Sequence, residues 1–174
     1  TFDLTTGVPG RAIPVPGATI LNGIGVATDG TIYTSNTREP ERIYKITASG
    51  TVSTLIDGAP LALPNGVAVD PQGNVVVVNI GNNDVLTFSP AGQLVRTEKA
   101  AEAGNDGVVV LPDGTKYTSS VRFGSVSRIR PGQPAEVIAS GIPAAASMCY
   151  DSRQNQLVIP MNPNNALAFI KLTP

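Results

Sequence analysis

One segment recurs four times along the chain at a spacing of 40 to 43 residues. Aligning Gly23 in LNGIGVATDGTIYTSN with Gly66 in PNGVAVDPQGNVVVVN and Gly107 in NDGVVVLPDGTKYTSS needs no gap. A fourth copy, ASMCYDSRQNQLVIP, aligns Ser147 with these glycines and takes one inserted residue. A fixed period of this length is the sequence signature of a repeat architecture, so we expect an array of similar structural units.

Each copy has the pattern of short strands joined by tight turns. In the first copy, alternating and β-branched residues predict strands over residues 24–27, 31–35, 42–47 and 51–56. The pairs Asp29-Gly30, Gln72-Gly73 and Asp113-Gly114 are typical of hairpin turns. Four antiparallel strands per repeat of this length are one blade of a β-propeller. Leucine-rich and helical repeats are excluded, because no apolar periodicity of 3.6 residues spans ten residues.

The predicted fold is therefore all-β, a propeller with four blade repeats in one domain of 174 residues. Blades are expected over residues 21–63, 64–104 and 105–144, and a final three-stranded blade over 145–174. Residues 1–20 resemble part of a blade, and they could supply the missing strand of the last blade and close the ring, because unpaired sheet edges are a liability. A closed ring of four blades, a homodimer, and a fragment that lacks an N-terminal segment are the alternatives.

Composition and charge exclude several classes of function. The formal net charge is −1 with scattered Lys and Arg, so no basic stripe for nucleic acid is present. No apolar run has the length of a membrane span. The chain has no histidine and one cysteine, Cys149, which excludes Ser-His-Asp and Cys-His triads, an internal disulfide and the usual zinc site. The compartment stays open, and an exported, periplasmic bacterial protein is compatible with the sequence.

The sequence PNGVAVDPQGNVVVVNIGNNDVLTFSPAGQLV resembles an NHL-type repeat. The succession LNG, PNG, NDG at blade spacing is similar to the regucalcin and gluconolactonase family (senescence marker protein type), whose propellers have six blades. The resemblance runs from Phe2 to Leu172 and covers the last four of those blades. It implies a metal-dependent lactonase-like hydrolase that acts on a small sugar lactone or a related ester.

The resemblance also implies a divalent cation on the propeller axis, Ca²⁺ before Mg²⁺, Mn²⁺ or Zn²⁺. In the family a glutamate, an asparagine and an aspartate hold the cation. The resemblance puts the asparagine on Asn65 and the aspartate on Asp106, with Asn22 facing the substrate. The family's glutamate lies in its first blade, which has no counterpart in this sequence.

The residues themselves point to the same place. The position before each aligned glycine starts an innermost strand, so Asn22, Asn65, Asp106 and Ala146 should converge on one axis. One aspartate and two amides are too few oxygens for a Ca²⁺ site alone, and a glutamate from another segment or chain would improve it. Asp106 is our candidate for both a metal ligand and the general base, because no histidine is present.

Two arginines recur at similar places in their repeats. The loops after the second strands should crowd the same mouth of the propeller, and they carry Arg38 and Arg122. A guanidinium there could bind a carboxylate or phosphate of the substrate, and a solvated loop charge is the alternative.

Each remaining candidate has a plain structural alternative. The three residues Asn22, Asn65 and Asp106 could be simple turn residues, because Asn and Asp before Gly favour turns. Cys149 is expected to be a buried, inert thiol in an inner strand. At the level of function, the alternatives to a hydrolase are a non-catalytic scaffold for a small ligand or protein partner, and an incomplete fragment without its first two blades.

Overall fold

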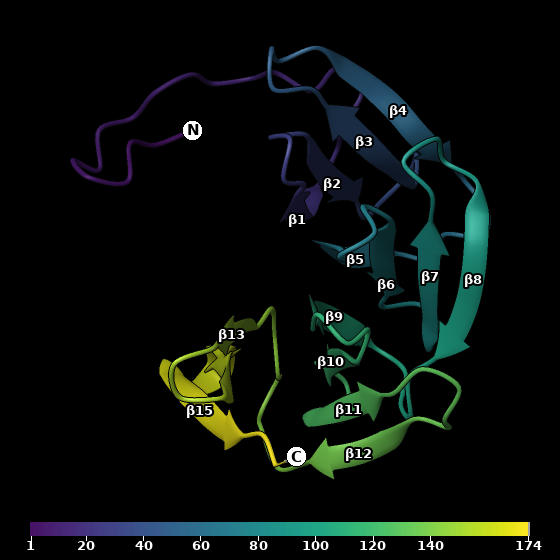
Figure 1. Ribbon diagram of the computed structural model, residues 1–174, viewed down its shortest axis with the longest axis vertical. Coiled ribbons are helices and arrows are strands. Elements are labelled where there is room, and N and C mark those ends of the chain that lie inside the picture. The colour runs from purple at the N-terminus through teal and green to yellow at the C-terminus, as the bar shows by residue number, and fades with distance from the viewer. Residues whose placement is uncertain (174) are drawn as a thin grey trace.

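The computed structural model describes residues 1–173 as four antiparallel β-sheets arranged around a centre, in a ring that is open on one side (Figure 1). We call these sheets blades 1 to 4 in chain order. The first three have four strands each and the fourth has three. Blades 1 and 2 contain β1 (Leu21–Val26), β2 (Ile32–Asn36), β3 (Arg42–Ile46), β4 (Val52–Asp57), β5 (Pro64–Val69), β6 (Val75–Asn79), β7 (Asp84–Phe88) and β8 (Leu94–Lys99). Blades 3 and 4 contain β9 (Asn105–Val110), β10 (Lys116–Ser120), β11 (Ser125–Ile129), β12 (Glu136–Ala139), β13 (Cys149–Asp151), β14 (Gln156–Met161) and β15 (Ala166–Lys171).

The local sequence explains the hairpins of each blade. Asp29 Oδ1 accepts a hydrogen bond of 2.9 Å from the backbone N–H of Thr31, and Gly30 has φ 82°, a conformation that favours glycine. The same turn recurs at Asp113 and Gly114. The predicted all-β repeat fold is confirmed, and the one helix of the described chain is a single 3₁₀ turn, Asn162–Asn164. No helix in residues 1–173 is long and apolar enough to cross a membrane.

Apolar faces hold neighbouring blades together. We call the face of a blade that is directed toward the preceding blade its A face, and the opposite one its B face. The B face of blade 1 packs on the A face of blade 2 through Tyr33, Ile43, Ile56, Val67, Val75, Val77, Leu86 and Phe88. Blades 2 and 3 meet through Val76, Val78, Val85, Val108 and Ile129, and blades 3 and 4 through Tyr117, Val126, Leu157 and Ile159. Successive side chains of a strand point to opposite faces of its sheet, and apolar residues occupy both faces of blades 2 and 3. Each of these blades therefore buries apolar surface against the blade on either side.

A buried serine also links neighbouring inner strands. The Ser35 hydroxyl accepts a hydrogen bond of 2.9 Å from the N–H of Gly23 and donates one of 2.6 Å to the carbonyl of Asn65 in the next blade. Ser119 repeats the arrangement, with an N–H from Gly107 at 2.9 Å and a bond of 2.7 Å to the carbonyl of Ala146. These bonds fix where the inner strand of one blade begins relative to the next.

The N-terminal segment lies against blade 1 and not on the last blade. Arg11 Nη1 donates a hydrogen bond of 2.6 Å to the carbonyl of Ser49, and the N–H groups of Thr19 and Ile20 each donate one of 2.8 Å to Asn36 Oδ1. These bonds hold residues 11–20 at blade 1, and the preceding residues extend away from it (Figure 1). Within residues 1–173, β14 is the only strand that pairs with β15. The closing strand expected from the sequence is therefore not formed by this segment.

Candidate functional site

The first site residues lie at an irregularity of the inner strands. Asn22 and Asn65 fall where the ladder to the second strand shifts register, between Leu21 and Ile24 in blade 1 and between Pro64 and Val67 in blade 2. In blade 3 the same shift lies opposite Asp106. A bulge of this kind re-aims side chains near the end of a sheet. These residues belong to strands and not to turns, so the turn interpretation does not describe their positions.

A pocket of about 160 Å³ lies where the four inner strands meet. Blade 1 lines it with Asn22, Gly23 and Ile24, and the other blades line it with Gly66, Val67, Gly107, Val108, Ser147 and Met148. The aligned residues of the repeat therefore converge, as their common position predicts. Glycine is required here because a Cβ on Gly66 would lie 2.5 Å from the carbonyl oxygen of Asp106. Any larger residue would push adjacent inner strands apart.

Asp106 is the centre of the polar contacts beside this pocket. Asn65 Nδ2 donates a hydrogen bond of 3.2 Å to Asp106 Oδ2, and the Ser147 hydroxyl donates one of 3.0 Å to Asp106 Oδ1. The structure thus brings Asn65 and Asp106 into contact and leaves Asn22 exposed on the pocket wall. Ser147 was not predicted as a site residue. Its alignment with Gly23, Gly66 and Gly107 could have identified it, because Ser147 is the only one of these four residues with a side-chain oxygen.

Burial raises the pKa of the Asp106 carboxyl, although the hydrogen bonds from Ser147 and Asn65 act in the opposite direction. None of the ion pairs within residues 1–173 involves Asp106. An acid whose pKa is raised on folding binds its proton more tightly in the folded state than in the unfolded chain. The carboxylate form of Asp106 therefore opposes folding above that raised pKa, which is common for residues kept for function.

Asp106→Asn is expected to raise the midpoint of thermal unfolding at pH 7, in the absence of divalent cations. The amide keeps the shape and an acceptor for Ser147 but removes the half-buried charge. The gain should shrink as the pH falls below the raised folded-state pKa toward the ordinary value of 3.8, because the wild-type carboxyl is then protonated in the folded protein. Differential scanning calorimetry at pH 7 and pH 4 measures both values. An equal effect at both pH values would contradict this account of Asp106.

The donor set fits one side of a cation site. Asn65 is buried, and its Oδ1 has no hydrogen-bond partner, which leaves an acceptor that a cation could satisfy. The Asp106 carboxylate and the Ser147 hydroxyl add two further types of oxygen donor. No three Asp, Glu, Cys or His side chains gather into a cation-binding group in the part of the chain that the structure describes. Waters or residues from outside these four blades would have to complete the shell.

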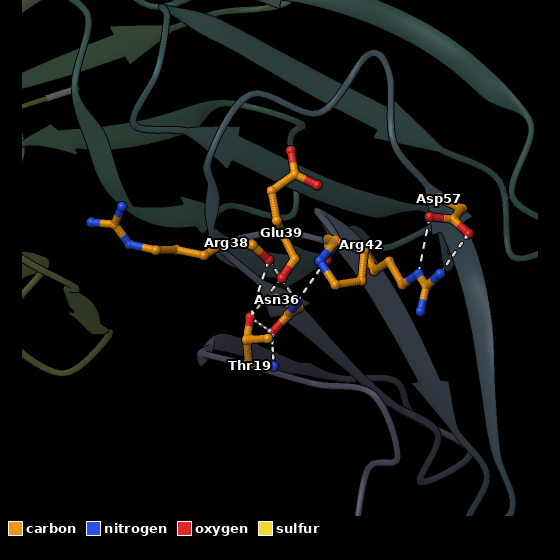
Figure 2. Close-up of polar contacts among 7 residues, drawn as sticks. Thr19, Asn36, Arg38, Glu39, Arg42 and Asp57 are labelled. Carbon is orange, nitrogen blue, oxygen red and sulfur yellow. Dashed lines mark hydrogen bonds and ion pairs between the residues drawn. The ribbon is translucent and has the colours of Figure 1, made fainter.

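The two arginines do not reach this site. Arg38 follows β2, and its carbonyl accepts a hydrogen bond of 2.8 Å from Asn36 Nδ2, so the loop backbone is held while the side chain is exposed. Figure 2 shows the guanidinium extending away from both the Thr19–Asn36 contacts and the Arg42–Asp57 ion pair. Arg122 is likewise exposed in the loop after β10. Neither lines the axial pocket, and their role in substrate binding stays a prediction.

Cys149 departs from its predicted environment. The sequence between Met148 and Tyr150 indicated a buried thiol, but Cys149 is exposed on β13. Its strand neighbour Tyr150 packs against blade 3, so the alternation of the strand directs Cys149 to the opposite, open face of blade 4. The expected burial required a further blade on that face.

Four sheets that radiate from one pocket define this protein as a β-propeller. Solved structures share the fold. A gluconolactonase from Xanthomonas campestris matches with a TM-score of 0.76 and 20% identity, over 99% of this chain and 64% of that one. A structure of a nidogen/laminin complex matches with a TM-score of 0.75 and 16% identity, over 93% of this chain and 68% of that one. Virginiamycin B lyase from Staphylococcus aureus matches with a TM-score of 0.67 and 15% identity, over 92% of this chain and 58% of that one.

These likenesses confirm the expected propeller architecture, including its relation to gluconolactonases at the level of fold. The identities are too low to carry an activity across. The chain spans 64% of the length of the gluconolactonase chain that it matches. No protein-family model and no curated protein matches the sequence.

Proposed function

We propose that this chain carries part of the active site of a cation-dependent hydrolase that acts on a small sugar lactone or a related ester. The observation that carries the proposal is the Asp106 carboxylate beside the axial pocket, which has no ion-pair partner in the described chain. Its pKa is raised, and it accepts hydrogen bonds from Asn65 and Ser147. The shared fold with gluconolactonases supports it. A perturbed carboxyl in a concave site is a candidate for catalysis on physical grounds.

Asp106 and the Oδ1 atom of Asn65 would hold the cation. When bound, a divalent cation polarises a carbonyl oxygen and lowers the pKa of water. The chain's own residues would then transfer the proton and orient the substrate. Asp106 is the carboxylate available as a general base, and the hydrogen bond from Ser147 fixes its orientation. Asn22 is exposed on the pocket wall and can donate or accept a hydrogen bond to a substrate hydroxyl.

Isothermal titration with Ca²⁺, Mg²⁺, Mn²⁺ and Zn²⁺ tests the site. We expect saturable binding of at least one cation, weakened at least tenfold by Asp106→Asn, because the site has a single carboxylate. Binding should also weaken as the pH falls toward the raised pKa of Asp106, since the proton and the cation compete. Asp113→Asn is the matched control, because Asp113 lies in a hairpin turn and bonds only to Thr115. Absence of saturable binding in the intact protein would refute the hydrolase proposal.

One observation favours the second candidate, a propeller that binds a small ligand without catalysis. A single carboxylate contacts the site within the described chain, so no acid/base pair is present there. A panel of aldonolactones and aryl esters separates the two functions. Turnover that Asp106→Asn abolishes supports the hydrolase, whereas cation binding without turnover supports the scaffold.

A further inference from the structure

Blades 2 and 3 enclose a groove at the outer rim of the propeller, where Figure 1 shows β8 and β12. A pocket of about 520 Å³ lies between β8 and the turn that joins β11 to β12. A pocket of about 250 Å³ adjoins it, and Arg96 and Pro131 line both, so we treat the two as one blade 2–3 groove. Its size is that of a small-molecule site. No residue of the axial pocket lines it.

A buried hydroxyl in this groove lacks a partner. Thr87 of β7 and Arg96 of β8 are cross-strand partners, and Val85 packs against blade 3, so all three belong to the B face of blade 2. Thr87 lines the smaller pocket and is 6% exposed, and its Oγ1 has no hydrogen-bond partner within residues 1–173. Because buried polar atoms are nearly always hydrogen-bonded, this hydroxyl indicates a polar molecule bound in the groove.

The ion pairs around the groove leave one cation without a close partner. Lys116 Nζ lies 2.8 Å from Glu98 Oε2, and Lys99 is paired with Asp84. The guanidinium of Arg96 lies 4.0 Å from Glu98, which is beyond hydrogen-bond distance. A planar guanidinium with free N–H groups matches a carboxylate or a phosphate in shape and charge. The groove therefore offers Arg96 to an anionic ligand.

The other lining residues favour a carboxylate with an apolar body. Asp70 lines the smaller pocket, and its carboxylate accepts hydrogen bonds from Gln72 and Asn74 in the hairpin turn. Its negative charge opposes a doubly charged phosphate more strongly than a singly charged carboxylate. Ile129 and Pro134 contribute apolar surface to the larger pocket. One negative charge next to an apolar group is thus the ligand chemistry that the groove matches.

From these features we infer that the blade 2–3 groove binds a small organic carboxylate with an apolar body. Arg96 binds the carboxylate, Thr87 donates a hydrogen bond to it, and the turn between β11 and β12 contacts the apolar body. Both blades have four strands, and the groove lies between them. The inference does not depend on the proposed hydrolase activity, because the axial pocket shares no residue with the groove.

Titration of the ¹⁵N-labelled chain with benzoate, followed by NMR without divalent cations, tests the groove. We expect saturable shifts of the backbone N–H signals of Arg96, Gly132 and Gln133, with a Kd of about 10 mM or tighter for a ligand of this size. The signals of Gly66 and Gly107, at the axial pocket, should not move. Benzoate that moves no signal of the groove would overturn the inference.

Two further probes test the choice of ligand chemistry. Benzamide has the shape of benzoate without its charge, so it should bind more weakly by about fivefold or more. Phenyl phosphate should bind no more tightly than benzoate, because the charge of Asp70 opposes its second negative charge. Equal binding of benzamide, or tighter binding of phenyl phosphate, would show that the groove does not select a carboxylate.

Variants of the two anchoring residues complete the test. Arg96→Gln should weaken benzoate binding by about fivefold or more, because the free guanidinium is lost. Thr87→Val should weaken it by about twofold or more without lowering the unfolding midpoint, since the hydroxyl has no partner to lose. Arg153→Gln is the matched control, because Arg153 is exposed and lines neither pocket. Unchanged affinity in both groove variants, or an equal loss in the control, would contradict binding in the groove.

Discussion

Gly23→Ala is expected to lower the free energy of unfolding by more than about 3 kcal/mol. A Cβ at this position would lie 2.0 Å from the carbonyl oxygen of Asn65 and 2.8 Å from the backbone nitrogen of Val67. Both atoms belong to the inner strand of blade 2, so no side-chain rotation relieves the overlap, and blades 1 and 2 must separate. Separation also breaks the bond from Ser35 to the Asn65 carbonyl. Urea unfolding followed by circular dichroism measures the loss.

Gly25→Ala provides the matched control on the same strand. Its Cβ would approach the carbonyl oxygen of Val67 to 3.1 Å, a tight contact that a small shift relieves. We expect a loss of about 1 kcal/mol. Similar losses for the two variants would show that strand propensity, and not the approach of the inner strands, determines the effect.

Lys116→Met is expected to cost about 3 kcal/mol. Lys116 Nζ lies 2.8 Å from Glu98 Oε2, and both side chains are largely buried between blades 2 and 3. Removing the ammonium leaves the Glu98 carboxylate between the blades with only Arg96, 4.0 Å away, as a nearby cation. An uncompensated buried charge costs more than the ion pair itself contributes. Chemical denaturation of the variant at pH 7 gives the free energy.

Two further variants separate charge from packing at this interface. Glu98→Leu combined with Lys116→Met should recover most of the loss, because the pair is then replaced by apolar side chains. Arg130→Met, which removes the exposed Arg130–Glu136 pair, should cost less than about 1 kcal/mol. If the double variant is no more stable than Lys116→Met alone, the loss comes from packing of the lysine stem.

The sequence was sufficient to predict the repeat, its strands and the meeting point of the inner strands. Hairpin turns and period-two alternation depend on neighbouring residues, and both are visible in one repeat, as in the turn at Asp29 and Gly30. The convergence of Asn65 and Asp106 follows from their equal positions in successive blades. A repeat makes a long-range contact predictable because the same local geometry recurs.

The remaining features depend on contacts between blades, which the pattern does not specify. Ser147 contacts Asp106 only because blade 4 packs beside blade 3, and Cys149 is exposed because no further blade covers it in the described chain. The N-terminal segment likewise follows its hydrogen bonds to Ser49 and Asn36 at blade 1. The sequence of this segment predicts strand-like structure, but it does not indicate which sheet the segment contacts.

The bulge at the start of the inner strands of blades 1 to 3 affects how such a site can change in evolution. One residue per blade reaches the axis, and the hairpins that carry it are closed by other residues. Asn22, Asn65 and Asp106 can therefore be exchanged separately without altering the architecture that presents them. Blades 1 to 3 thus each present one polar side chain near the axis from a position that their own hairpins do not need.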